Sequence, residues 1–270
     1  MLPLLETRSL CRYFGGLKAL EKVDIQVFDG EIFGIIGPNG AGKTTLFNVI
    51  TGFLEATSGS VLFKGKQITN LAPERIARLG IARTFQNIRL FKHMTVLENV
   101  RVGFHIHTKT SILDAFLRSR TFWDDETKTM QRSLDILRRV GLVEQMFYTA
   151  SSLPYGMQRK LEIARALASD PVLLLLDEPA AGMNPKETAD LVEFIRKLNK
   201  EGLTIMIIEH DMKVIMNVCH RIAVLNYGVK ICEGTPTDVQ RNQEVIEAYL
   251  GRGRVSFGKS QEGALESLPL

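Results

Sequence analysis

A glycine-rich segment near the N-terminus has the residue types and the spacing of a phosphate-binding loop. Residues 37–45 read Gly-Pro-Asn-Gly-Ala-Gly-Lys-Thr-Thr, in which a glycine is followed five positions later by Gly-Lys-Thr. The glycines allow backbone conformations that a side chain would block, so that successive N–H groups point at phosphate oxygens. The segment predicts a nucleoside triphosphate site formed by Gly37, Pro38, Asn39, Gly40, Ala41, Gly42, Lys43, Thr44 and Thr45.

Two side chains of this loop have chemical roles of their own. Lys43 brings a full positive charge toward the outer phosphates, and the Thr44 hydroxyl is suited to ligate Mg²⁺. A helix that starts near Lys43 adds unpaired N–H groups and the positive end of its dipole. An ordinary glycine-rich turn is the simpler alternative, but the Gly-Lys-Thr sequence and its setting favour the nucleotide site.

A pair of carboxylates forms the second candidate group. The apolar run 172–176 leads directly into Asp177 and Glu178. Ligands of parallel α/β sheets bind beyond the carboxyl ends of the strands, so Asp177 is expected near Mg²⁺ and Glu178 near the terminal phosphate and a water molecule. Two solvated acids in a loop remain the alternative, but the buried strand and the phosphate loop upstream favour catalysis.

The elements around these motifs follow from hydrophobic periodicity. An apolar run at 32–36 precedes the phosphate loop, and Leu46, Val49 and Ile50 share one face of the helix that follows it. Further strands are expected at 172–176, 204–208 and 221–225, separated by amphipathic helices. This alternation predicts a sheet that is parallel at its centre. Helix caps are expected at Asn184, before Pro185, and at Asp211.

Two other regions do not show this α/β alternation. The chain begins with a β-rich segment, with a turn at Asp29-Gly30, and a second strand pair is expected at 59–63 and 65–68. A short helix at 73–79 ends at Gly80. From about residue 89 to residue 169 the pattern is mainly helical, which predicts a helical subdomain. Residues 251–270 lack any period and are predicted to form a mobile tail.

Composition limits the class of protein. The 270 residues are 45% hydrophobic, which is enough for one large domain or a domain with a subdomain. No apolar run approaches the ~20 residues of a membrane span, and the N-terminus shows no secretion signal, so the cytoplasm is expected. A net charge of +4 is too balanced to predict nucleic-acid binding.

Cysteine and histidine give no sign of a metal centre. Cys11, Cys219 and Cys232 are odd in number and far apart, which predicts reduced, structural thiols rather than disulfides or a zinc site. His105 and His107 are expected to be surface residues, because no cysteine or carboxylate cluster accompanies them in the sequence.

With these motifs in order, residues 4–250 resemble the ATP-binding subunits of ABC transporters. The resemblance implies the P-loop NTPase fold of ABC ATPases: a mainly parallel core sheet, an antiparallel β subdomain and an inserted α-helical subdomain. It places Phe14, or its neighbour Tyr13, in the loop that stacks on adenine, although an aromatic residue near a strand start is often a core residue. It makes Gln86, in Arg83-Thr84-Phe85-Gln86, the Q-loop residue that touches Mg²⁺ and senses the membrane subunit.

The resemblance also identifies a switch histidine and a signature loop. His210 follows the strand at 204–208, which brings it to the same sheet edge as Glu178, where an imidazole can hydrogen-bond the γ-phosphate. The signature loop reads Leu-Pro-Tyr-Gly-Met-Gln at 153–158. It resembles Leu-Ser-Gly-Gly-Gln, but its second and third residues are proline and tyrosine, so the serine hydroxyl is lost.

The remaining groups of the signature loop are still suited to bind an anion. Gly156, Gln158 and the N-terminus of the following helix are implied ligands of the ATP held by a second subunit. Asn184 stands at the family's acidic D-loop position, where it can hydrogen-bond but carries no charge.

Several segments resemble one subgroup, the LivG-type ATPases of branched-chain amino acid importers. They are the Leu-Pro-Tyr-Gly loop with Gln-Arg-Lys-Leu-Glu-Ile-Ala-Arg-Ala-Leu after it, residues 177–185 and 208–212, and the insert at 104–130. The resemblance implies ATP and Mg²⁺ as cofactors and ATP hydrolysis across a head-to-tail dimer. Its implied partners are integral membrane permease subunits, a second identical or related ATP-binding subunit and, indirectly, an extracytoplasmic substrate-binding protein.

This assignment implies a peripheral location at the cytoplasmic face of the cell (inner) membrane, with no nucleic acid as a partner. Substrate choice resides in other subunits, so an ABC transporter for another substrate is the first alternative. A soluble ABC ATPase of DNA repair or translation is a second, although the chain has one set of motifs and no coiled-coil or zinc insertion. A small-molecule kinase would leave the signature loop, Gln86 and His210 unexplained.

Overall fold

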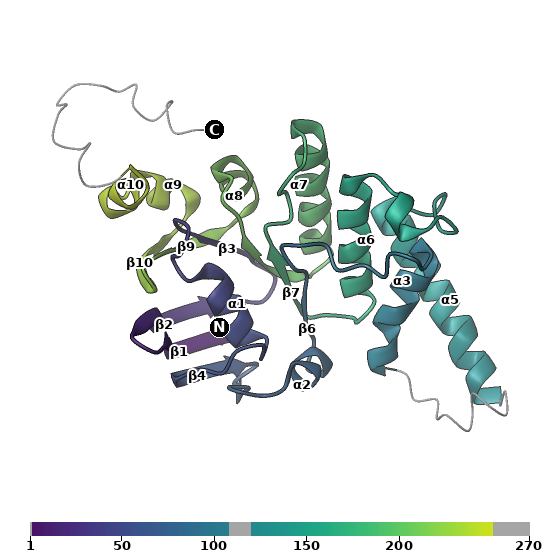
Figure 1. Cartoon of the computed structure of the whole chain (residues 1–270), viewed down its shortest axis with the longest axis horizontal. Helices are drawn as coiled ribbons and strands as arrows, with labels where there is room; N and C mark the ends of the chain where they lie inside the picture. The colour runs from purple at the N-terminus through teal and green to yellow at the C-terminus, as the bar shows by residue number, and fades with distance from the viewer. Residues whose placement is uncertain (1, 108–119, 251–270) are drawn as a thin grey trace.

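A computed structural model describes residues 2–107 and 120–250. The predicted tail at 251–270 and residues 108–119 of the predicted insert at 104–130 lie outside these residues. The described part contains two sheets and a set of helices around them (Figure 1).

The larger sheet has six strands in the order β10-β9-β3-β8-β7-β6, with parallel neighbours everywhere except for the antiparallel pair β9 and β10. The strands, in chain order, are β3 Ile32–Ile36, β6 Ile81–Arg83, β7 Leu173–Asp177, β8 Thr204–Ile208, β9 Arg221–Asn226 and β10 Val229–Gly234. The strands expected at 32–36, 172–176, 204–208 and 221–225 are therefore confirmed to within one residue.

The smaller sheet is antiparallel, in the order β2-β1-β4-β5. Its strands are β1 Leu5–Phe14, β2 Leu17–Val27, β4 Ser58–Phe63 and β5 Lys66–Gln67. The predicted strand pair after residue 58 is confirmed, and so is the predicted fold class: a mainly parallel core sheet, an antiparallel sheet and a group of helices.

Helices pack around the core sheet, and a group of them lies beside it on one side. They are α1 Lys43–Ile50, α2 Pro73–Arg78, α3 Val96–Gly103, α5 Arg120–Val140, α6 Tyr155–Leu167, α7 Pro185–Lys200, α8 Met212–Val218, α9 Pro236–Arg241 and α10 Gln243–Leu250, with short 3₁₀ turns at Phe104–His107 and Ala150–Ser152. Figure 1 shows α3, α5 and α6 together on the side of the molecule away from the antiparallel sheet. The limits of a separate helical subdomain at 89–169 stay a prediction.

Alternation along the strands divides the core into two layers, because successive side chains point to opposite faces of a sheet. Phe33 and Leu175 pack with Leu46 of α1 on the face toward the antiparallel sheet. Leu174 packs with Leu191 of α7 on the other face. The phosphate loop between β3 and α1 is thus anchored at both ends by fully buried residues.

Local signals place the helix starts. The Asn184 side chain accepts hydrogen bonds from the N–H groups of Lys186 and Glu187, and the Asp211 side chain accepts one from Lys213. Both predicted caps are confirmed. They fix the first residues of α7 and α8, which follow the two strands that end beside the carboxylate pair.

Cys11, Cys219 and Cys232 are free thiols in the described part of the chain, and Cys11 and Cys219 are buried. His105 is exposed, and residues 2–106 and 122–249 hold no group of three histidine, cysteine or acidic side chains that could bind a metal ion. Within the same described part, every helix is too short or too polar to span a bilayer.

Candidate nucleotide-binding site

The phosphate loop requires glycine at two of its positions. Gly37 has a φ of 150°, and a Cβ there would lie 2.1 Å from the carbonyl oxygen of Leu225. Gly42 has a φ of 102°, and a Cβ there would lie 2.5 Å from the carbonyl oxygen of Ala19. Strands β9 and β2 therefore press directly against the loop backbone. A side chain at either position would displace the loop.

Lys43 is held inside this loop. Its ammonium nitrogen donates to the carbonyl oxygens of Gly37, at 2.7 Å, and Pro38, at 3.1 Å. Burial lowers the pKa of Lys43, whereas the nearby charges of Glu178 and Asp177 raise it. An ammonium group has three N–H donors, so one remains for a phosphate oxygen.

A cavity of about 460 Å³ opens above the loop. It brings together the predicted loop residues with Gln86, Glu178 and Phe14. Its lining consists of Phe14, Leu17, Lys18, Ala19, Asn39, Gly40, Ala41, Gly42, Lys43, Thr44, Thr45, Gln86, Glu178 and Tyr227. Residues from five separate parts of the sequence thus surround one space.

Phe14 belongs to the rim of this cavity rather than to the core. Its side chain is 42% exposed, and the Arg12 guanidinium lies 4.5 Å from the ring centroid. Leu17 and Tyr227 are also exposed on the cavity wall, and Tyr227 has a positive φ of 46°. These two residues belong to no recognisable motif, because Leu17 begins β2 and Tyr227 lies in the turn between β9 and β10.

Asp177 is buried at the end of β7 and paired with Arg83, whose Nη2 is 2.8 Å from its Oδ2. Arg83 also donates to the side chains of Asn48 and Thr51, which ties the carboxylate to the end of α1. Burial raises the pKa of Asp177, and Arg83 opposes that change. Within the described residues, Oδ1 of Asp177 has no hydrogen-bond partner. An unpartnered buried carboxylate oxygen fits a site for a divalent cation.

Glu178 is held in an unusual conformation beside Gln86. Its φ is 46°, and its N–H donates to the carbonyl oxygen of Ile208 at 2.9 Å. Its carboxylate accepts a hydrogen bond of 2.9 Å from Nε2 of Gln86. A left-handed backbone costs free energy in a residue other than glycine, so its surroundings must hold Glu178 in place.

His210 lies at the same sheet edge but outside the cavity. Its Nδ1 is 3.8 Å from Oε2 of Glu178, and its side chain is 62% exposed. The predicted proximity of these two residues is therefore present, whereas Asp177 and His210 are absent from the described cavity lining. Glu209, which sequence reasoning missed, is buried and accepts hydrogen bonds from the N–H groups of Ala180 and His210.

The signature loop lies elsewhere. Helix α6 begins directly after Pro154, whose side chain makes no capping hydrogen bond. Gly156 is packed so closely that a Cβ there would lie 2.9 Å from Oε1 of Glu187. Gln158 donates from its side chain to the carbonyl oxygen of Leu153 at 2.8 Å. In the described lining of the cavity there is no residue from 153–158.

The loop, the carboxylate pair and the two-sheet fold define a nucleotide-binding ATPase cassette, and comparison with known families agrees. The chain belongs to the ABC transporter family, whose model matches residues 20–181. A second model, described as a branched-chain amino acid ATP-binding cassette transporter, matches residues 229–255. The chain therefore binds ATP and is an ATP-hydrolysing subunit of a transporter.

Individual relatives resemble the chain over nearly its whole length. It is 46% identical to the high-affinity branched-chain amino acid transport ATP-binding protein LivG of Escherichia coli (strain K12), over 92% of this chain and 98% of LivG. It is 45% identical to the corresponding protein BraF of Pseudomonas aeruginosa, with the same coverage. A solved ATP-binding cassette of an ABC transporter in its ADP conformation is 36% identical, with a TM-score of 0.81 over 93% of this chain and 100% of that one.

Proposed function

We propose that this chain drives an importer of branched-chain amino acids. The observation that carries the proposal is the near full-length similarity to LivG, together with the separate match at residues 229–255. The substrate itself binds to other subunits, so this chain contributes ATP hydrolysis and contacts with the membrane part. It acts at the cytoplasmic face of the membrane as a peripheral subunit.

The hydrolytic chemistry is assigned to three side chains. Lys43 binds the outer phosphates with its remaining N–H donor, which stabilises the charge that develops on them. Glu178 orients or deprotonates the attacking water, because its carboxylate lies on the cavity wall. His210, 3.8 Å from Glu178, donates to the γ-phosphate. Phe14 stacks on the adenine from the rim.

The same site fits Mg²⁺. Thr44, Gln86 and Asp177 would hold the ion, since a hydroxyl, an amide oxygen and a carboxylate are the oxygen ligands that it prefers. When bound, Mg²⁺ supplies positive charge that neutralises the phosphate oxygens. Burial raises the pKa of Asp177, and the Arg83 guanidinium opposes that rise and so favours the charged form of this ligand.

The site is completed by a second subunit. The signature loop does not line the described cavity of its own chain, so Gly156, Gln158 and the start of α6 are assigned to the ATP of a partner in a head-to-tail dimer. ATP binding then favours the closed dimer and hydrolysis releases it, which is a population shift driven by differential affinity. The partner is a second copy or a related ATP-binding subunit.

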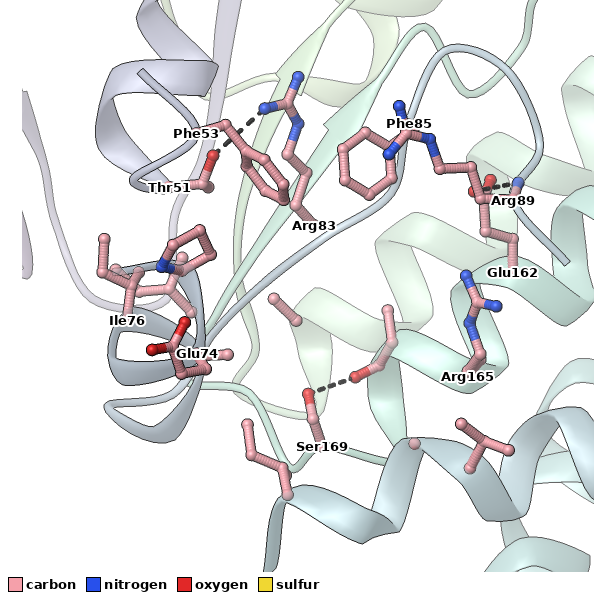
Figure 2. Close-up of a pocket in the computed structure, with 18 of the residues that line it drawn as sticks. Thr51, Phe53, Glu74, Ile76, Arg83, Phe85, Arg89, Glu162, Arg165 and Ser169 are labelled. Carbon is pink, nitrogen blue, oxygen red and sulfur yellow. Dashed lines mark hydrogen bonds between the residues drawn. The ribbon is translucent and has the colours of Figure 1, made fainter. Parts of the chain in front are cut away.

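The membrane subunits are proposed to dock in a groove beside the Q-loop. This hollow of about 730 Å³ lies between α2 and β6 on one side and α3 and α6 on the other (Figure 2). Phe53 and Phe85 meet edge to face in it, with ring centroids 5.5 Å apart, and Phe91 is 47% exposed. Arg89 lies over the Phe85 ring at 4.0 Å.

A short amphipathic helix of a permease, with apolar and acidic side chains, suits these walls. The groove and the nucleotide cavity share no described lining residue, but the backbone joins them, because Phe85 lines the groove and the next residue, Gln86, lines the cavity. A segment that enters the groove therefore contacts the backbone that carries Gln86. This continuity favours a membrane subunit over an unrelated partner.

Co-purification tests the proposal. Tagged Glu178→Gln protein, isolated from its native cells in mild detergent with ATP and Mg²⁺, should bring two polytopic membrane proteins and an ATP-binding subunit with it. Labelled leucine uptake by the reconstituted complex should then require ATP. Recovery of ribosomes or DNA without membrane proteins would contradict the transport assignment, and uptake of another solute but not leucine would contradict the substrate.

A further inference from the structure

Helix α6 carries a fully buried ion pair. Nη1 of Arg159 lies 2.8 Å from Oε2 of Glu162, and both side chains are 0% exposed. The two residues are three positions apart and therefore share one face of the helix. Burial of two charges is costly unless further hydrogen bonds satisfy them, so the groups that they bind are informative.

Both members of the pair bind the backbone of the Q-loop. Arg159 donates to the carbonyl oxygens of Phe85, at 2.7 Å, and Gln86, at 2.8 Å. Oε1 of Glu162 accepts a hydrogen bond of 3.1 Å from the Arg89 N–H, which Figure 2 shows beside the groove. The beginning and the end of the loop are thus fastened to the same helix.

Through Gln86, this attachment connects α6 to the carboxylate of Glu178. The backbone of Gln86 is held by Arg159, and its side-chain amide donates to Glu178 at 2.9 Å. Arg159 also lies near the signature loop, since its Nη2 is 3.3 Å from the Tyr155 hydroxyl. A displacement of the start of α6 would therefore be transmitted to Gln86 through the Arg159 side chain, which is buried and hydrogen-bonded to both Tyr155 and Gln86.

We propose that Arg159 and Glu162 are positioning residues for ATP hydrolysis. They fix the Q-loop on α6, so that the Gln86 amide meets Glu178 only when the signature helix is correctly placed. The inference rests on the proposed roles of Gln86 and Glu178. It adds an internal route by which the part of the chain that serves the partner's ATP controls hydrolysis of the chain's own ATP.

A double-mutant cycle on the full chain tests this route. Arg159→Met combined with Glu162→Leu removes both charges together and leaves no unpaired buried charge. Steady-state ATPase assays should show a fall in kcat of about tenfold with KM for ATP changed less than twofold, as expected when an interaction acts on the chemical step. Adding Gln86→Ala to this pair should lower kcat by less than a further twofold, because both changes disable one pathway.

Two controls make the outcome decisive. Arg138→Gln with Asp135→Asn removes an exposed pair of the same spacing on α5 and should leave kcat unchanged. Thermal unfolding identifies any variant that has lost its fold. If the pair variant is unfolded, Glu162→Gln is the milder substitute. It should also lower kcat while leaving KM for ATP nearly unchanged. Fully multiplicative effects of Gln86→Ala and the α6 pair, or an unchanged kcat in the pair variant, would overturn the inference. If Gln86→Ala or Glu178→Gln alone has no effect, the proposed catalytic roles fail instead.

Discussion

The nucleotide cavity and the apolar groove lie on the two sides of one short segment, yet they are built in opposite ways. Residues 39–45 alone supply half of the residues that line the cavity. The groove collects single side chains from α2, β6, α3 and α6, between Thr51 and Ser169. The comparison teaches that the phosphate chemistry is a local property of the chain, whereas the partner surface exists only in the folded molecule.

The segment between them decides how the two hollows communicate. Phe85 lines the groove and its neighbour Gln86 lines the cavity, at a bend in the chain just after β6. Arg83 begins the segment and is bound to Asp177. Substitutions in the cavity should therefore change ATP binding or hydrolysis without changing partner binding, and substitutions in the groove should do the reverse. Substitutions in the segment between them should affect both functions.

The largest expected effect concerns Glu178 in the cavity. Glu178→Gln should lower the ATP hydrolysis rate by roughly 10² to 10⁴, the range typical for loss of a general base, while the Kd for ATP stays within a few-fold. Hydrolysis of labelled ATP and equilibrium binding measure the two quantities. Glu193→Gln, on the exposed face of α7, is the matched control. Unchanged turnover in Glu178→Gln would remove this residue from the mechanism.

Loss of Lys43 should act on binding first. Lys43→Ala removes the charge held at the loop by two carbonyl oxygens, so ATP affinity should fall by roughly 10- to 100-fold, as expected for a hydrogen bond to a charged group. Isothermal titration with ATP gives the Kd, and Lys200→Ala, at the exposed end of α7, should bind as the wild type. Co-purified membrane proteins should be unaffected. A normal Kd would contradict the phosphate-loop assignment.

A variant in the groove should weaken binding of the membrane subunits and leave ATP binding unchanged, which is the reverse of the effect expected for Lys43. Phe91→Asp places a charge where we expect an apolar contact, and should reduce recovery of the membrane subunits by about tenfold, a typical loss for one interface residue. ATP binding by the purified chain should not change. Phe147→Asp alters an aromatic residue that is 68% exposed away from the groove, and serves as the control. Equal recovery with both variants would move the docking site elsewhere.

The smallest expected effect concerns Tyr249, next to the phosphate loop, and the pH dependence of the free energy of unfolding. Burial raises the pKa of Tyr249 in α10 to about 12, while the Gly37 N–H favours its ionised form. The folded state therefore holds the phenol proton more tightly than the unfolded state, so this stabilisation is complete below the unfolded pKa of about 10 and is lost as the pH rises toward 12. By pH 11 the wild type should lose roughly 1 kcal/mol that Tyr249→Phe does not lose. Chemical unfolding at pH 8 and pH 11 would show parallel losses if Tyr249 were not buried.

The local part of the structure was predictable from the sequence. Glycine spacing, apolar strands and caps such as Asn184 depend on neighbours within a few residues, and the structure confirms them. The groove was not predicted, because its walls come from segments remote in the sequence and carry no common spacing. Arg159 and Glu162 could be paired by their separation, but charges on a helix usually face water, so only the packing of α6 against the Q-loop reveals their burial.

The sequence identified most residues of the site but not all of the contacts between them. The sequence placed Glu178 and His210 at one sheet edge, and the two side chains lie 3.8 Å apart. The partner of Asp177 was missed, although Arg83 stands in the same short motif as Gln86, because nothing in the sequence aligns the ends of β6 and β7. Contacts across a sheet depend on strand order, which hydrophobic periodicity does not determine.

The central claim is that residues 83–89 convert events in the cavity into events in the groove. We would measure ATP-driven leucine uptake in proteoliposomes that contain the complete complex with Gln86→Ala in this chain. Uptake should be abolished, while the Kd for ATP stays within twofold and the membrane subunits still co-purify. Uptake at the wild-type rate, with ATP binding and assembly equally intact, would contradict the claim that this segment couples the two sites.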